Sequence, residues 1–247
     1  MPPAEAADAP TPAGRGVPGA PLPVQLHLAG RPCLVVGGGA VAARRVRTLL
    51  DAGAVVTVVA PDLDPALEAL IDDGPVHLHR RGFRPGDLDP DGGGRFALVV
   101  TATGDPEVDR AVGEQAASAG VLVNRADEAS AGDLSFPAVV RRGPVTVAVG
   151  SAGRAPTVSR WLAQLLEERL DELLGLGPEG YEVLVDLVEE VRTELRDRRR
   201  QGDGEGTGVT PDALNWRAAL DGSILDLIDQ GRRAEAKERL LACLSSS

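Results

Sequence analysis

The residues most suited to chemistry form a glycine-rich segment in the first quarter of the chain. Gly37-Gly38-Gly39-Ala40-Val41-Ala42 fits the pattern G-x-G-x-x-G/A. The first glycine allows a tight turn, the second lets the backbone approach a pyrophosphate, and the small last residue lets a helix pack closely against a strand. Free N–H groups at the start of that helix attract phosphates. The segment therefore predicts a dinucleotide site, against the alternative of a merely flexible loop.

The end of the next expected strand bears on which dinucleotide binds. An acidic residue there usually contacts the ribose hydroxyls. Here the strand ends Val59-Ala60-Pro61-Asp62, so the position itself is not acidic and Asp62 follows slightly late. No basic residue is present for a 2′-phosphate. We therefore expect NAD rather than NADP, with backbone around Pro61 and Asp62 holding the adenosine end.

An aspartate follows the last expected strand of the same region. Asp127 lies just beyond residues 121–124, at the carboxyl end of a strand, where ligands bind in open parallel sheets. It is either functional or a cap of the following turn. Its neighbours Glu128 and Asp133 either raise its pKa by repulsion or are solvated and without effect.

A second aspartate follows the expected strand 96–101. Asp105 precedes Pro106, which is typical of a helix N-cap with proline in the first turn. We therefore assign Asp105 no catalytic role. The preceding residues, Thr101, Ala102 and Thr103, are expected to line the nicotinamide end of the dinucleotide site.

Arginines are concentrated in one stretch of this acidic chain, whose net charge is −11. Residues 137–160 contain Arg141, Arg142, Arg154 and Arg160 and no acidic residue. Arginine binds a carboxylate through two hydrogen bonds, so the stretch suits a substrate with many carboxylates. Arg141 and Arg142 flank an expected turn and fit ordinary surface residues better, which leaves Arg154 and Arg160 as the stronger candidates.

The elements that must position these residues alternate between strand and helix. Short apolar runs predict buried strands at 33–36, 55–59, 76–79, 96–101 and 121–124, and amphipathic segments predict helices at 40–52, 65–71 and 106–117. This alternation predicts an α/β fold with a doubly wound, Rossmann-like parallel sheet.

The alternation of strands and helices ends after Asn124. Two strands are expected at 134–140 and 145–149, then helices at 156–174 and 181–199, and helical structure over 211–244. We expect a disordered extension at 1–21, a dinucleotide-binding domain at 22–133, a dimerisation and substrate segment at 134–175, and a helical C-terminal domain at 176–247 with a linker near 201–210.

Composition argues against several classes of protein. No run approaches the roughly 18 apolar residues that span a membrane, and the acidity disfavours binding to nucleic acid or an anionic membrane surface. The two distant cysteines, Cys33 and Cys243, provide neither a disulfide framework nor metal-ligand spacing. Residues 1–21 lack the layout of a signal peptide, so we expect a cytoplasmic protein without a resident metal.

Several segments together resemble the precorrin-2 dehydrogenase module of siroheme synthases. The resemblance covers about residues 22–160, while the helical tail is similar in character only. The segments that carry it are Leu22-Pro23-Val24, Cys33 to Arg45, Ala52-Gly53-Ala54, Thr101-Ala102-Thr103-Gly104-Asp105, Val123-Asn124-Arg125-Ala126-Asp127, Phe136-Pro137-Ala138, and Val147 to Pro156 with Arg160.

This resemblance implies NAD-dependent oxidation of precorrin-2 to sirohydrochlorin by a homodimer, and in some members insertion of Fe²⁺ to give siroheme. It implies that Asp127 is the catalytic aspartate and that Ser151 lies in a substrate-facing loop, where some members are phosphorylated. Arg154 and Arg160 then become candidates for binding the substrate carboxylates.

Two other functions remain open from the sequence. A dinucleotide-sensing module would regulate a partner without catalysis, but it would need neither Asp127 nor the arginines, and it would often carry a DNA-reading element, which is not visible here. A chelatase without dehydrogenase activity would not need the intact glycine-rich segment.

Overall fold

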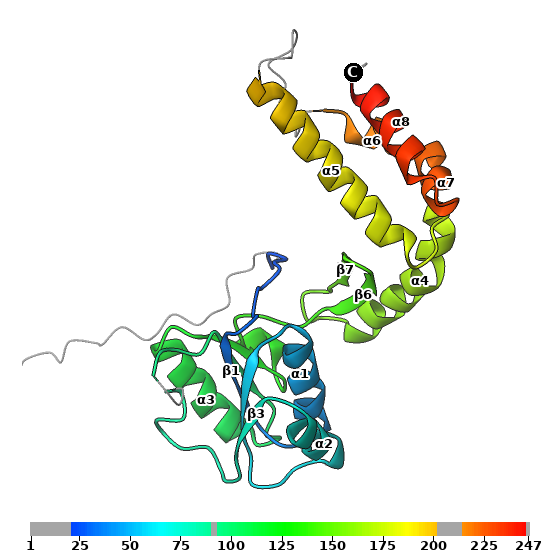
Figure 1. The fold of residues 1–247 in the computed structure, drawn as a ribbon. Helices are drawn as coiled ribbons and strands as arrows, with labels where there is room; N and C mark the ends of the chain where they lie inside the picture. The colour runs from blue at the N-terminus through cyan, green and yellow to red at the C-terminus, as the bar shows by residue number, and fades with distance from the viewer. Residues whose placement is uncertain (1–20, 90–92, 202–213, 246–247) are drawn as a thin grey trace, which may run out of the picture. The chain divides into compact units, whose positions relative to one another are not determined.

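The computed structural model describes residues 21–89, 93–201 and 214–245, which belong to two compact units. The first unit ends at Phe136 and the second starts at Pro137. Nearly all of the expected N-terminal extension and of the expected linker near 201–210 lies outside the described residues. Figure 1 shows the elements of each unit.

The first unit contains a five-stranded parallel sheet in the order β3-β2-β1-β4-β5. The strands are β1 (Pro32–Val36), β2 (Val55–Val59), β3 (Val76–His79), β4 (Leu98–Thr101) and β5 (Leu122–Arg125). The chain runs outward from β1 to β3 and then returns to β4 on the other side of β1. The predicted doubly wound parallel sheet is confirmed, and a ligand crevice is expected where the strand order reverses.

Helices on both faces of this sheet explain why its strands are almost entirely apolar. They are α1 (Ala40–Asp51), α2 (Pro65–Asp73) and α3 (Pro106–Ser118), followed by a short 3-10 turn at Ala129–Ala131. Alternate residues of each strand face opposite sides. Cys33 and Val35 of β1 pack with α1 and α2, whereas Leu34 and Val36 pack with α3.

The second unit begins with an antiparallel hairpin and continues as helices (Figure 1). Its elements are β6 (Ala138–Arg142), β7 (Val145–Val149), α4 (Pro156–Leu174), α5 (Gly180–Gln201), α6 (Trp216–Ala219), α7 (Gly222–Asp229) and α8 (Arg233–Ser245). The strand expected from residue 134 begins only at Ala138. Leu134 and Phe136 instead pack against the core of the first unit, and Phe136 also lies under the guanidinium of Arg45.

A polar network within the second unit joins the hairpin to its helices. Arg142 Nε donates to Asp171 Oδ1 at 2.9 Å, and the hydroxyl of Tyr181 donates to the same oxygen at 2.9 Å. Burial, together with this hydrogen bond, raises the pKa of Tyr181 to about 12. Arg142 is therefore a structural residue, in line with the expectation that it is not a substrate ligand.

No helix in the described parts of the chain is both long and apolar enough to cross a membrane.

The core of the second unit is built mainly from leucine, isoleucine and valine around the fully buried Tyr181. The helical structure expected over 211–244 is formed, in the described residues, by the three helices α6, α7 and α8.

Candidate active site

A cavity of about 640 Å³ opens at the carboxyl ends of β1, β2 and β4. This position is the expected crevice of the doubly wound sheet. The lining residues are Val36, Gly37, Gly38, Gly39, Val59, Pro61, Asp62, Leu63, Asp64, Gly82, Phe83, Thr103, Asp105 and Val108.

The three glycines of the turn have different structural roles. Gly37 has a φ of 127°, in the region that favours glycine, and a Cβ there would lie 2.2 Å from the carbonyl oxygen of Ala102. A Cβ on Gly38 would lie 1.8 Å from the carbonyl oxygen of Asp62. Both positions therefore require glycine for the turn itself to form.

Gly39 differs because a Cβ there would meet nothing within 4 Å. It is the N-cap of α1, it provides no side-chain cap, and the first turn of α1 holds no acidic residue. The free N–H groups of this helix start are thus available to an anion. The open cradle fits the pyrophosphate of a dinucleotide, which a side chain at Gly39 would displace.

Pro61 and Asp62, which the sequence proposes for the adenosine end, line the cavity together with neighbours that it did not single out. Asp64 caps α2, its Oδ1 accepting from the N–H of Ala66 at 2.9 Å, so this carboxylate is occupied locally. Phe83 adds an aromatic wall. Among the described residues that line the cavity, none is lysine or arginine.

Of Thr101, Ala102 and Thr103, which the sequence proposes for the nicotinamide end, only Thr103 is among the residues that line the cavity. Thr101 is fully buried, and Ala102 packs against the core. Ala40 and Val41 lie in the first turn of α1 and are not among the lining residues. Asp105 accepts hydrogen bonds from the N–H groups of Glu107 and Val108, which confirms its expected role as a helix cap.

Asp127 follows β5 and forms a two-pronged ion pair. Arg125 Nε donates to Asp127 Oδ1 at 3.1 Å, and Arg125 Nη2 donates to Oδ2 at 2.6 Å. Hydrogen bonding from the guanidinium holds the pKa of Asp127 below its usual range. The suggestion that Glu128 and Asp133 raise this pKa is therefore wrong.

Asp133 has a local structural role instead, because its Oδ2 accepts from the N–H of Val123 at 3.1 Å. Arg125 was not singled out from the sequence, although the signal was available. Residues i and i+2 of an extended strand share one face. An arginine two positions before an aspartate at a strand end can therefore reach it.

In the second unit, Ser151 lies in the loop between β7 and α4. Its Oγ accepts from the N–H of Ala155 at 3.0 Å, and its carbonyl oxygen accepts from the N–H of Arg154 at 3.0 Å. Ala152 has a φ of 54°, a strained value for alanine. The side chains of Arg154 and Arg160 are exposed, next to the start of α4 and within it.

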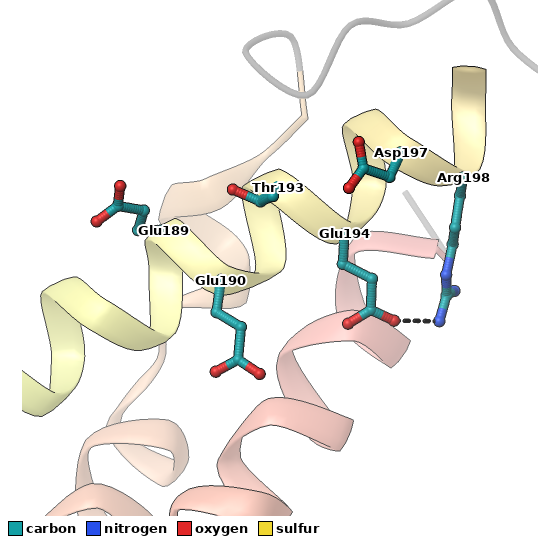
Figure 2. Close-up of a pocket in the computed structure, with 6 residues that line it drawn as sticks. All are labelled: Glu189, Glu190, Thr193, Glu194, Asp197 and Arg198. Carbon is teal, nitrogen blue, oxygen red and sulfur yellow. Dashed lines mark hydrogen bonds and ion pairs between the residues drawn. The ribbon is translucent and has the colours of Figure 1, made fainter. Parts of the chain in front are cut away.

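A second cavity, on α5, is acidic but already neutralised in part (Figure 2). Glu190 pairs with Arg233 and Lys237, and Glu194 pairs with Lys237 and Arg198. In the described part of the chain, no three His, Cys, Asp or Glu residues come together to hold a metal ion. These contacts join α5 to α8 and suggest a structural role.

Known proteins similar to this chain agree with the site. Residues 24–138 match a family model described as putative NAD(P)-binding. The siroheme synthase of Nitrosococcus oceani is 36% identical over 223 residues, which cover 90% of this chain and 44% of that protein. The siroheme synthase of Chromobacterium violaceum is 38% identical over 226 residues, again covering 90% of this chain and 44% of the relative.

The chain thus spans less than half the length of these curated relatives. Among solved structures, SirC, a precorrin-2 dehydrogenase, matches with a TM-score of 0.54 and 25% identity, over 92% of this chain and 100% of that chain. Over about 90% of its length the chain is similar to siroheme synthases, its fold matches that of SirC, and most of its first unit matches a family described as putative NAD(P)-binding.

Proposed function

We propose that this protein oxidises precorrin-2 to sirohydrochlorin with NAD⁺, in the biosynthesis of siroheme. The observation that carries the proposal is a cavity at the carboxyl-end edge of the parallel sheet, the edge at which Asp127 follows β5 and pairs with Arg125. The chain's similarity to siroheme synthases and to SirC supplies the substrate class.

The first unit is proposed to hold the dinucleotide through its backbone. Gly39 and the start of α1 receive the pyrophosphate, while Pro61 and Asp62 contact the adenosine end. The acidic, arginine-free lining favours NAD over NADP, because a 2′-phosphate would find no cation among the described lining residues. Bound there, NAD⁺ supplies the acceptor for the hydride that leaves the substrate.

Asp127 is proposed as the base that takes the proton released in the oxidation. Its pairing with Arg125 holds the pKa of Asp127 below its usual range, so the carboxylate is ionised throughout the physiological pH range, which is the form that a base requires. Ser151, Arg154 and Arg160 are proposed to bind the substrate carboxylates, since arginine matches a carboxylate through two hydrogen bonds.

The alternative of a dinucleotide sensor without catalysis is less well supported. It leaves the ionised Asp127 without a role, and the relatives and SirC carry names of enzymes. Insertion of Fe²⁺ into sirohydrochlorin is a further proposed activity, with iron as substrate. We also propose that the protein works in the cytoplasm.

The test is anaerobic incubation of the purified chain with precorrin-2 and NAD⁺, with and without Fe²⁺, followed by absorption spectroscopy. We expect the spectrum of sirohydrochlorin to appear only when NAD⁺ is present. Conversion to siroheme on addition of Fe²⁺ would establish the chelatase activity as well. A chain that binds NAD⁺ but leaves precorrin-2 unchanged would instead support the sensor.

We further propose that the second unit forms a homodimer through α4. Val158, Trp161 and Leu165 are exposed by 48%, 58% and 39%, and their spacing places them along one stripe of the helix. The two-stranded hairpin β6–β7 packs against α4, and a hairpin of this size needs such packing to be stable. A second copy of this chain would cover the stripe and extend this packing.

Trp161→Glu is expected to shift the protein from dimer to monomer in sedimentation velocity, because a charge would be buried in the stripe. Leu173→Glu is the comparison variant, since Leu173 is 70% exposed and lies near the other end of α4, beyond the last residue of the stripe. Dimerisation that survives Trp161→Glu would exclude this surface as the interface.

A further inference from the structure

The Arg125 side chain is buried and packed, unlike the arginine of an ion pair at the protein surface. It is the last residue of β5 and lies opposite Thr101 of β4. Only 9% of the residue is exposed, and a Cβ built on Gly113 of α3 would lie 3.6 Å from its Cδ. The guanidinium therefore emerges from a packed stem between β5 and α3, with little freedom to reorient.

The two hydrogen bonds from Arg125 to Asp127 determine the orientation of the carboxylate. They join Nε to Oδ1 and Nη2 to Oδ2, in the parallel geometry that the planar guanidinium favours. The Asp127 side chain remains 26% exposed. Its orientation is therefore held by Arg125 while a ligand can still reach the carboxylate.

Two further carboxylates act on the guanidinium. Glu128 follows Asp127 in the chain, and Asp109 comes from α3; both stabilise the charge on Arg125. Asp109 is 1% exposed, and its Oδ1 accepts from Thr103 N–H at 3.2 Å and from Thr103 Oγ1 at 2.8 Å. Thr103 lines the cavity. Asp109 therefore contacts a residue of the cavity wall on one side and stabilises the charge of Arg125, the partner of Asp127, on the other.

We propose that Arg125 is a positioning residue that holds the Asp127 carboxylate in one orientation and in its charged form, with Asp109 linking this pair to Thr103 at the cofactor cavity. The proposal rests on the proposed function, because it assigns Arg125 a part in the same reaction. The lowered pKa of Asp127 supports it, since hydrogen bonding from Arg125 is the largest contribution to that shift.

Arg125→Met tests this role in the full chain. With precorrin-2 and NAD⁺, we expect kcat to fall roughly ten-fold and the acid limb of the pH profile to move to higher pH, because the hydrogen bonds that lower the pKa of Asp127 are lost. The KM for NAD⁺ should stay unchanged, because the glycine turn is intact. Arg125→Lys keeps the charge but not the planar pair of donors, so a smaller change in the same direction is expected.

Arg110→Met is the matched control, because Arg110 forms an exposed pair with Glu114 on the same helix that carries Asp109. It should leave kcat and the pH profile as in the wild type. A purely structural role for Arg125 would lower thermal stability without moving the acid limb.

A measurement independent of turnover separates this proposal from the proposed function. The ¹³C carboxyl signal of Asp127, assigned by its loss in Asp127→Asn, should titrate at higher pH in Arg125→Met than in the wild type. An unchanged midpoint and acid limb would overturn the role of Arg125 even if the wild type oxidises precorrin-2. If Arg125→Met does not fold, wild-type values in Arg125→Lys would overturn it equally.

Discussion

Asp127→Asn is expected to lower kcat for precorrin-2 oxidation by about 10²–10⁴-fold, the usual contribution of a positioned general base. The amide has nearly the shape of the carboxylate but cannot take up a proton at neutral pH. NAD⁺ affinity should not change, because Asp127 is not among the residues that line the dinucleotide cavity. Anaerobic stopped-flow absorption measures the rate, and calorimetry measures the binding of NAD⁺.

The pH dependence of the wild type adds a second expectation. Because Arg125 holds the pKa of Asp127 below its usual range, the base stays ionised as the pH falls and loses its charge only below the ordinary range of an aspartate. The rate should therefore persist into acid until that point, as long as the protein stays folded.

Glu114→Gln is the control for the aspartate variant, since Glu114 is an exposed carboxylate of α3 that pairs only with Arg110 among its described ion pairs. It should have wild-type rates. If Asp127→Asn oxidises precorrin-2 as fast as the wild type, Asp127 is not the base, whatever its position in the fold.

Gly39→Leu is expected to weaken NAD⁺ binding by roughly 100-fold or more while the fold remains intact. A Cβ at Gly39 would meet no atom within 4 Å, so a leucine can be placed there without a clash at its Cβ and would occupy the place proposed for the pyrophosphate. Two lost hydrogen bonds to a charged group are worth about 3 kcal/mol, which corresponds to roughly a 100-fold change in affinity. Calorimetry with NAD⁺ and a thermal melt followed by circular dichroism measure the two effects.

Gly222→Leu provides a matched control, because Gly222 also starts a helix and has open space at its Cβ, but it lies in the second unit. Gly38→Ala provides the contrasting case. Its Cβ would lie 1.8 Å from the carbonyl oxygen of Asp62, so this variant should lose stability as well as binding. Undiminished NAD⁺ affinity in Gly39→Leu would contradict the assignment of the turn to the pyrophosphate.

The strands and helices of the first unit were largely predictable because their signals are local. β2 and β3 begin and end where apolar residues between turn residues predicted, and α3 begins with a proline directly after a capping aspartate. The strand expected from Leu134 was an error of a different kind. Leu134 and Phe136 are apolar because they complete the core of the first unit, and a pattern of apolar residues does not reveal which core they join.

In the candidate site, too, some features depend only on nearby residues in the sequence, and others depend on the folded chain. The sequence alone determined the glycine turn, the capping role of Asp105, and the aspartate beyond β5, because each depends on a residue type at a fixed distance from a strand end. It also determined the parallel sheet, since alternating strands and helices have few other ways to bury both faces.

The alternation of side chains along a strand allows Arg125 to reach Asp127, but only the tertiary structure decided that this pair forms. The Arg125 stem packs against α3 and its guanidinium donates two hydrogen bonds to the carboxylate, whereas the adjacent Glu128 does not set the ionisation of Asp127. The structure likewise distinguished Gly39, with open space for a ligand, from Gly37 and Gly38, which the turn itself requires. Electrostatic and steric effects fall off over a few ångströms of space, so their partners are set by the folded chain and not by sequence distance.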